Sequence, residues 1–318
     1  MQFRSLGKTG LSIAPLVFGG NVFGWTADEK ISFDLLDAFT GAGFNAIDTA
    51  DVYSRWAPGN QGGESEAIIG KWFKRSGIAR DKVVIITKVG ADMGQGRRDL
   101  RKSWIVEEVE ASLKRLQSDH IDLYLSHWPD AETPYEETLE AHARLVKDGK
   151  VRAFGASNLD ASQLQASFAA ADGAGLPRYA VLQPEYNLYD RDGFEGALAD
   201  LCQKEGIGVI TYYSLASGFL TGKYRTKADT EGKARGDGVV HYLDDKGQRI
   251  LATLDRVAAE TGAKPAEIAL AWLMAKPAVT APIASATSLE QLASLTKAAA
   301  LSLSAGQMAA LDQAGAGS

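Results

Sequence analysis

Four polar residues of this sequence have the types and spacing needed to protonate a carbonyl group. The apolar run FNAI (44–47) ends in Asp48, Tyr53 follows five residues later, Lys88 ends VVIITK, and His127 ends IDLYLSH. A tyrosine with its ordinary pKa of about 10 is a poor acid near neutral pH, and a nearby ammonium lowers that pKa. An aspartate keeps such a lysine charged, and a neutral histidine donates a hydrogen bond to a carbonyl oxygen. The set predicts a general acid, its tuning charge and a carbonyl-positioning donor.

Each of these residues also has a purely structural interpretation. Asp48 and Thr49 could cap a turn, Lys88 could be a charge at a strand end that reaches solvent, and His127 could be a buried, hydrogen-bonded histidine. The pattern lacks a Ser-His-Asp arrangement. The histidines at 120, 127, 142 and 241 are scattered, with no pair four residues apart, so no metal site is expected. The four residues together favour catalysis over four independent structural roles.

Short apolar runs alternate with helix-period segments along the chain, and these elements must position the four residues. Runs typical of buried parallel strands cover 15–20, 44–49, 83–88, 121–127, 151–157, 180–186, 208–213 and 280–285. Helical periodicity covers 28–43, 64–76, 102–117, 133–150, 160–172, 192–206, 264–276 and 288–300. Eight such units predict a (β/α)8 barrel whose strand ends share one mouth. The rival is an open doubly wound sheet, but the glycine cluster GNQGGE at 59–64 lacks the dinucleotide-binding spacing.

Two segments lie outside the eight units. Residues 3–15 have the character of a β-hairpin that could close the bottom of the barrel, and residues 214–263 form a long excursion after the seventh strand. Such insertions are commonly loops that close over a ligand. No linker divides the chain, so residues 1–318 are expected to form one domain.

The composition excludes several classes of function. With 34 Lys and Arg against 40 Asp and Glu, the net charge is −6, which disfavours binding to nucleic acid or to an anionic membrane. The basic clusters at 97–102 and 223–227 are short and are expected in solvated loops or helix starts. Cys202 is the sole cysteine and is expected to be buried. Because no signal or membrane-spanning segment is recognisable, a cytoplasmic location is expected.

The sequence resembles the aldo-keto reductases along nearly its whole length. The motifs that carry the resemblance are LGKTGLSIAPLVFGG, FNAIDTADVY, GGESEAIIGKW, VVIITKVG, IDLYLSHWPD, KVRAFGASN, QPEYNL, GFLTGKY, AEIALAWLM and APIASATSLEQL, in this order. The resemblance implies a (β/α)8 barrel that reduces aldehydes or ketones with a nicotinamide dinucleotide. It implies that Tyr53 is the proton donor, that Lys88 and Asp48 lower its pKa, and that His127 orients the substrate carbonyl.

The resemblance also implies a set of cofactor contacts. Ser157, Asn158 and Gln183 would bind the nicotinamide carboxamide, and Tyr212 would stack on its ring. Leu215, Ser217 and Gly218 would line the pyrophosphate, with Lys223 as part of a belt over it. Further contacts are assigned to Gly20, Asn21, Asp48, Tyr213, Ser214, Ala284, Ser285, Ala286, Thr287 and Gln291.

Two stretches depart from the family pattern. After the seventh strand the chain has Tyr213-Ser214 where the family often has Ser-Pro, so the backbone there could differ. After the eighth strand, NADPH-selective members commonly have Lys or Arg, whereas this chain has Ser285, Thr287 and Gln291. A helix start near Ser288 and hydroxyl groups still bind phosphate, but a charge-assisted hydrogen bond is roughly twice as strong. We therefore expect NADP(H) to be used and NAD(H) to be tolerated.

The substrate is expected to be a small aldehyde, a ketone or a sugar-derived carbonyl. Trp25, Trp56 and Trp128 fall in loops after predicted strands and are expected to line the pocket with Tyr53 and His127, although packing beneath the loops is an equal alternative. Two other functions remain open: a nucleotide-sensing regulatory subunit with little turnover, as in similar channel-associated proteins, and an aldolase or isomerase with Lys88 as a Schiff base. A monomer or a small homo-oligomer is expected.

Overall fold

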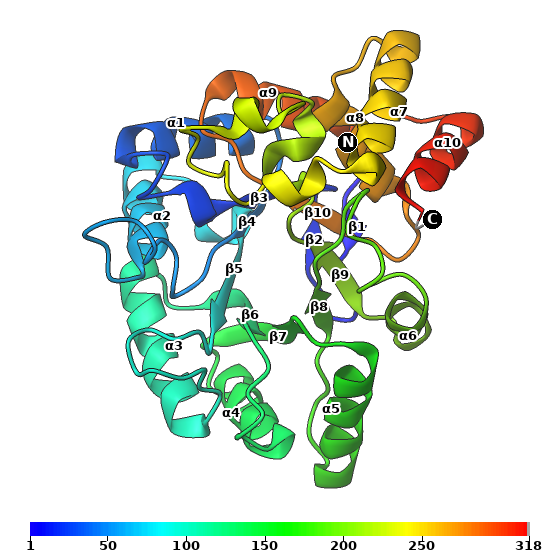
Figure 1. Ribbon diagram of the computed structural model, residues 1–318. Helices are drawn as coiled ribbons and strands as arrows, with labels where there is room; N and C mark the ends of the chain where they lie inside the picture. Colours follow the sequence, from blue (N-terminus) through cyan, green and yellow to red (C-terminus); the bar gives the residue numbers. More distant parts are fainter. Residues whose placement is uncertain (317–318) are drawn as a thin grey trace.

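Eight parallel strands close into a barrel in the computed structural model, which describes residues 1–316. The strand order is β10-β3-β4-β5-β6-β7-β8-β9, so each strand pairs with the next one along the chain and the last pairs with the first (Figure 1). The strands are β3 (Val17–Gly19), β4 (Ala46–Asp48), β5 (Val84–Val89), β6 (Ile121–Ser126), β7 (Val151–Ser157), β8 (Val181–Gln183), β9 (Gly208–Thr211) and β10 (Ala281–Ala284). The predicted (β/α)8 barrel is confirmed, and the open doubly wound sheet is excluded.

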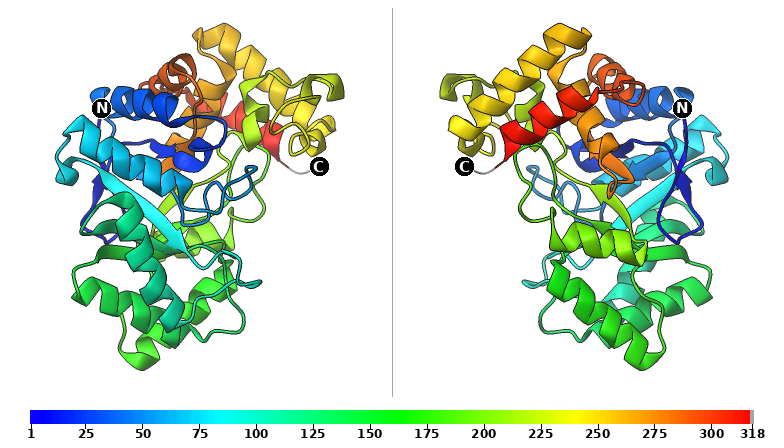
Figure 2. Two further views of the ribbon diagram at one scale, coloured as in Figure 1. Left: turned by 90° about the vertical axis from the view of Figure 1, so that its left-hand side faces the viewer. Right: turned by 90° about the vertical axis from the view of Figure 1, so that its right-hand side faces the viewer.

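A ring of helices covers the outside of the barrel (Figure 2). The eight helices predicted from periodicity are present as α1 (Glu29–Gly41), α2 (Glu64–Ser76), α3 (Lys102–Leu116), α4 (Tyr135–Lys147), α5 (Ala161–Ala174), α6 (Ala197–Glu205), α8 (Pro265–Ala275) and α9 (Leu289–Ala298). Local chemistry fixes their starts. The side chain of Asp160 accepts a hydrogen bond from the backbone N–H of Gln163, and that of Ser288 accepts one from Gln291.

The alternation of side chains along each strand divides the core into two apolar layers. In β5, Ile85 belongs to the layer between strands and helices, whereas Ile86 belongs to the layer inside the barrel. The predicted N-terminal hairpin is present as β1 (Arg4–Ser5) and β2 (Ser12–Ile13), paired antiparallel. Leu6 and Ile13 of this hairpin are fully buried in the inner layer, so the hairpin closes the amino-terminal end of the barrel as expected.

The expected strand over 180–186 is shorter in the structure. The strand β8 ends at Gln183, directly before Pro184, which has no backbone N–H to continue the ladder.

The excursion after β9 is only partly a loop. It contains three short 3-10 helices, η3 (Ala216–Thr221), η4 (Lys227–Thr230) and η5 (Val240–Tyr242), and then the 17-residue helix α7 (Asp245–Thr261). The expectation of a loop through residue 263 is wrong for α7, which is capped by Asp244 and buries Ile250, Leu254 and Val257. A further helix without a sequence-based prediction, α10 (Ala305–Gly315), packs against α7.

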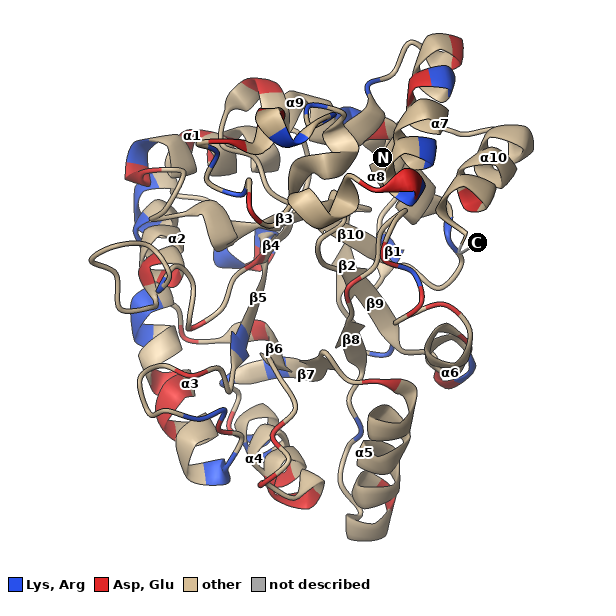
Figure 3. Cartoon of the chain, in the orientation of Figure 1, with Lys and Arg blue, Asp and Glu red and all other residues tan. Residues whose placement is uncertain are grey.

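Charged residues are distributed around the outer helices and loops, with both signs interspersed (Figure 3). Among the described residues, no helix combines the length and the apolar character needed to cross a membrane. Cys202 is buried in α6 as predicted, and burial raises the pKa of its thiol to about 12.

Candidate active site

The predicted proton-donating group assembles at the mouth formed by the carboxyl ends of the strands. Asp48 is the last residue of β4, Lys88 lies in the adjacent β5, and Tyr53 follows β4 in the connecting loop. The Lys88 ammonium lies 2.7 Å from Asp48 Oδ1 and 3.1 Å from the Tyr53 hydroxyl. Adjacent strands that end at one rim bring together residues separated by up to 40 positions in sequence.

The ammonium of Lys88 is fully satisfied and fully buried. Besides Asp48 and Tyr53 it donates a hydrogen bond to the backbone oxygen of Thr49 at 2.7 Å, and its side chain is 0% exposed. Three acceptors use all three donors of an ammonium group. A Schiff base requires a free, deprotonated amine, so this geometry argues against the alternative role of Lys88 as a nucleophile.

Burial and charge act in opposite directions on these groups. Burial acts to lower the pKa of Lys88, but the Asp48 carboxylate and Tyr53 outweigh it, and the net pKa is raised, so the ammonium stays charged. Burial raises the pKa of Tyr53 above its ordinary value; Lys88 opposes this shift and Asp48 adds to it. Lys88 therefore lowers the pKa of Tyr53 as expected, but by less than burial raises it. The expectation that Asp48 also lowers this pKa is wrong, because its negative charge raises it. Tyr53 holds its proton at neutral pH in the protein without ligand.

His127 is buried, uncharged and adjacent to the tyrosine. Its ring lies 6.0 Å from that of Tyr53 in an edge-on arrangement, and its backbone N–H bonds to Val89. Burial, with the charges of Lys88 and Arg98, holds the pKa of His127 well below its usual range. Its Nδ1 atom is buried without a hydrogen-bond partner among the described residues. An uncharged imidazole is the state that the predicted carbonyl-positioning role requires, and that role stays a prediction.

The residues assigned to the carboxamide group form one hydrogen-bonded network. Gln183 Nε2 donates to Asp48 Oδ2 at 2.8 Å, and Ser157 Oγ donates to the backbone oxygen of Gln183 at 2.7 Å. Asn158, in a left-handed conformation with φ 62°, accepts from the Tyr212 hydroxyl at 2.7 Å and donates to the backbone oxygen of His127 at 2.8 Å. The network ties the proton-donating group to the ends of β7, β8 and β9.

The segment after β9 has an unusual backbone. Ala216, Ser217 and Gly218 have φ values of 47°, 55° and 96° in succession, all in the left-handed region. At Gly218 a Cβ atom would lie 3.4 Å from Lys223 Nζ, so the glycine leaves room for this ammonium beside the backbone. The Tyr213-Ser214 departure also has a structural consequence: Tyr213 adopts φ 50° and is half exposed, while Ser214 is buried against Thr211.

The polar groups of the segment after β10 are hydrogen-bonded to other groups of the protein. Ser285 Oγ donates to Asn21 Oδ1 at 2.6 Å, beside Gly20 in the 3-10 helix η1 (Gly20–Val22). Gln291 Oε1 accepts from the backbone N–H of Thr287 at 2.9 Å. Ala284 and Ala286 are buried around these polar groups, and Leu215 packs against the core in the facing segment. The side chains of Ser285, Thr287 and Gln291 carry no charge, as the sequence predicts. The nearby acidic residue Glu290 lies in the first turn of α9.

Aromatic rings lie beside Tyr53 and His127. Trp56 lies 5.5 Å from Tyr53 and 5.9 Å from Trp25, and Trp128 stacks on His127 at 5.9 Å. Of the three predicted tryptophans, Trp56 therefore contacts Tyr53 and Trp128 contacts His127, whereas Trp25 contacts Trp56. Within residues 1–316, no cluster of three or more His, Cys, Asp or Glu side chains could hold a metal ion.

Two arginines at the mouth are not among the site residues predicted from the sequence. Arg235, from the excursion after β9, places its guanidinium 5.5 Å from the ring of Trp25, and Arg98 lies 4.7 Å from the ring of Trp128. In sequence, Arg98 is part of a basic run expected in solvated surface, and Arg235 lies in a Gly-rich segment. Neither arginine lies at the end of a predicted strand. Their position at the mouth is therefore known only from the folded structure.

The fold and the polar residues at the strand ends define a (β/α)8-barrel protein with a site at the carboxyl rim. A family model described as the aldo/keto reductase family matches residues 15–316, and the chain belongs to this family of oxidoreductases.

The chain is similar in sequence to three relatives over most of its length. The chain is 36% identical to the uncharacterized oxidoreductase YrpG of Bacillus subtilis, over 95% of this chain and 92% of that protein. It is 35% identical to a probable voltage-gated potassium channel subunit beta of Arabidopsis thaliana, over 94% and 91%. It is 34% identical to the aldo-keto reductase YhdN of Bacillus subtilis, over 87% and 82%.

Proposed function

We propose that this protein reduces an aldehyde or a ketone to an alcohol, with Tyr53 as the proton donor. The observation that carries the proposal is the buried contact of the Lys88 ammonium with both the Tyr53 hydroxyl, at 3.1 Å, and Asp48, at 2.7 Å. A tyrosine that gives up its proton leaves a phenolate, and a fixed ammonium at this distance stabilises that charge. Small carbonyl compounds are the substrates of the family, and we expect an aldehyde, a ketone or a sugar-derived carbonyl.

The residues at the mouth fit a nicotinamide dinucleotide. The left-handed run 216–218 leaves space beside Gly218, and the Lys223 ammonium there suits a pyrophosphate. The network of Ser157, Asn158 and Gln183 offers amide and hydroxyl groups next to Asp48. When bound, the nicotinamide supplies the hydride. The aldo/keto reductase family generally uses NAD(P)H, which agrees with this set of donors.

The side chains of the chain have separate tasks in this reaction. His127, neutral and next to Tyr53, donates a hydrogen bond that orients the carbonyl oxygen. Tyr53 then transfers its phenolic proton to that oxygen, and Lys88 stabilises the phenolate while Asp48 holds Lys88 in place. Trp25, Trp56 and Trp128 exclude water from the face on which the substrate lies.

The test of the proposed function is an activity screen. Aldehydes, aldoses and ketones are each incubated with the protein and NADPH, and the loss of absorbance of the reduced nicotinamide is followed. We expect steady oxidation of NADPH with at least one class of carbonyl. The absence of turnover across all three classes would count against the proposal.

The pH profile of kcat/KM is expected to show no inflection near 6.5. The pKa of His127 is held well below its usual range by burial, so the imidazole is already neutral at pH 6 and no proton leaves it between pH 6 and 8. Activity should fall only on the alkaline side, where Tyr53 with its raised pKa loses its proton. An inflection near pH 6.5 in the wild-type profile that is absent in His127→Gln would contradict the expectation that His127 is neutral between pH 6 and 8.

Coenzyme selectivity is expected to be weak because Ser285, Thr287 and Gln291 carry no charge. NADPH should be used and NADH tolerated. Gln291→Arg should raise the NADPH preference, measured as the ratio of the two kcat/KM values, about tenfold, because a hydrogen bond to a charged group contributes about 1.5–3 kcal/mol. Gln291→Glu, the matched variant of opposite charge, should lower the ratio. A coenzyme titration in which NADH fails to bind would refute the tolerance.

A regulatory subunit is the second candidate, favoured by the similarity to a probable potassium channel subunit beta. Such a protein would bind the dinucleotide and turn over little. The two functions differ in one measurement: steady NADPH oxidation that depends on Tyr53 supports the enzyme, whereas tight NADPH binding without turnover supports the sensor. A monomer or a small homo-oligomer remains a prediction, which analytical ultracentrifugation would decide.

A further inference from the structure

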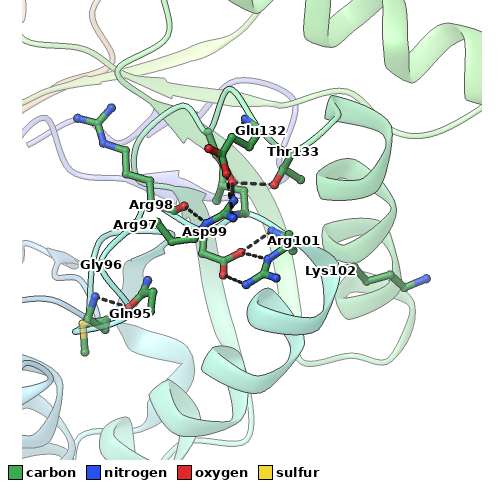
Figure 4. A network of polar contacts seen from close by, with 12 residues as sticks. Gln95, Gly96, Arg97, Arg98, Asp99, Arg101, Lys102, Glu132 and Thr133 are labelled. Atoms are coloured by element: carbon green, nitrogen blue, oxygen red, sulfur yellow. Dashed lines mark hydrogen bonds and ion pairs between the residues drawn. The ribbon is translucent and has the colours of Figure 1, made fainter.

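The loop between β5 and α3 carries three arginines, two of which have carboxylate partners. Arg97 lies 3.4 Å from Asp130 and 2.9 Å from Glu132, and Arg101 pairs with Asp99. Figure 4 shows this network, with the side chain of Arg98 extending away from it. Across residues 1–316, no carboxylate lies within ion-pair distance of Arg98; its contact is the ring of Trp128, at 4.7 Å. One cation of a closely paired network is thus left exposed and unpaired.

The position of Arg98 connects it to the proton donor through a row of rings. Trp128, under its guanidinium, stacks on His127 with ring centres 5.9 Å apart and planes at 19°. His127 in turn lies 6.0 Å from Tyr53. The charge of Arg98 is also one of the causes that lower the pKa of His127, after burial and Lys88. The positive charge of Arg98 therefore acts at His127, next to Tyr53.

The chemistry of this arrangement suits one kind of ligand group. The Arg98 guanidinium, 4.7 Å from the centre of the Trp128 ring, has N–H groups that no carboxylate of residues 1–316 occupies. Their fork geometry matches the two oxygens of a carboxylate. One guanidinium balances the single charge of a carboxylate but not the charge of about −1.5 to −2 of a phosphate monoester.

We propose that Arg98 selects carbonyl substrates that carry a carboxylate a few atoms from the reacting carbonyl group. The carbonyl oxygen would lie at Tyr53 and His127, the body of the substrate would lie along Trp128, and the carboxylate would pair with Arg98. This inference rests on the proposed carbonyl reduction and adds the substrate class. Arg98 is then a specificity-determining residue at the rim.

The kinetic test compares 4-carboxybenzaldehyde with its methyl ester, which has the same ring and carbonyl but no charge. We expect wild-type protein to prefer the acid, and Arg98→Gln to lower the acid-to-ester ratio of kcat/KM about tenfold, mainly through the KM of the acid. Arg98→Lys keeps the charge but not the fork and should restore part of the ratio. Lys102→Gln is the matched control, because it removes a nearby exposed cation that is already paired with Glu140 at 2.9 Å.

Several outcomes would overturn the proposal. A wild-type ratio near one, or the same ratio in Arg98→Gln as in wild type, would show that Arg98 does not select the substrate. An equal fall in Lys102→Gln would show a general effect of charge. A clearly greater preference for 4-formylphenyl phosphate than for the acid would show that Arg98 selects a phosphate and not a carboxylate. Thermal unfolding of each variant shows whether it is folded.

A binding measurement separates this proposal from the proposed function. By calorimetry with NADP⁺ present, wild-type protein should bind 4-methylbenzoate about tenfold more tightly than 4-methylbenzamide, and Arg98→Gln should lose that difference. If neither aldehyde is reduced but the difference in binding is found, the proposed function fails while the carboxylate site stands. If aldehydes are reduced without any difference in binding or kinetics, the carboxylate site fails alone.

Discussion

Tyr53→Phe is expected to lower kcat for carbonyl reduction by a factor of about 10² to 10⁴, the usual contribution of a positioned general acid. The substitution removes one hydroxyl oxygen and leaves the ring, which packs against Trp56 and His127, in place. Among residues 1–316, the only hydrogen-bond partner of this hydroxyl is Lys88. The measurement is steady-state oxidation of NADPH with the best carbonyl from the screen.

The control for Tyr53→Phe is cofactor affinity. Because Tyr53 is not part of the network of Ser157, Asn158 and Gln183, the Kd of NADPH, measured by fluorescence, should change little. His127→Phe serves as a comparison that removes the positioning donor instead of the proton. Retention of more than a tenth of the wild-type kcat in Tyr53→Phe would mean that another group delivers the proton.

Lys88→Met is expected to abolish most of the activity and to destabilise the fold. The variant removes the charge that stabilises the Tyr53 phenolate and leaves the buried Asp48 carboxylate with no cation. Removing one partner of a buried ion pair typically costs about 3–5 kcal/mol. Chemical denaturation measures the free energy of unfolding, and NADPH oxidation measures the activity.

The loss of stability in Lys88→Met should depend on pH. Burial already raises the pKa of Asp48, and without Lys88, which opposes that shift, the folded-state pKa rises further above the unfolded value. A carboxyl whose folded pKa is raised contributes stability while protonated, and this contribution is lost as pH rises through the folded pKa. The variant should therefore be less destabilised at pH 5 than at pH 8.

The double variant Lys88→Met with Asp48→Asn separates the two effects. It removes the unpaired charge, so most of the stability and its pH dependence should be restored while activity stays low. Additive effects of the two substitutions on stability would show that the Lys88–Asp48 contact, 2.7 Å in the structure, contributes no coupling.

Local signals made most of the barrel predictable. Short apolar runs such as 121–127 between helical periods predict strands buried on both faces, and strict alternation of the two predicts a parallel barrel. Caps such as Asp160 with Gln163 mark helix starts in the sequence itself. The helix α7 is not predicted, because the Gly-rich, charged stretch before it suggests a loop that continues through residue 263. Ile250, Leu254 and Val257 nevertheless recur at helical spacing.

The positions of the apolar runs already indicate which residues stand at the strand ends. Because side chains at the carboxyl ends of barrel strands share one mouth, the sequence predicts that Asp48, Lys88 and His127 lie together, with Tyr53 on the loop beside them. The polar types at these positions predict the class of chemistry. Both inferences need only the period of the strands and the direction of the chain.

The electrostatic balance of the site and the charge pairing at its rim depend on the folded structure. The net direction of the Tyr53 pKa depends on how completely neighbouring segments exclude water, which no local pattern encodes. The unpaired state of Arg98 likewise depends on how the neighbouring arginines are paired: Arg101 with Asp99 of the same loop, and Arg97 with Asp130 and Glu132 of the loop after β6. Residue types follow from the sequence, but desolvation and the assignment of charge partners are properties of the folded chain.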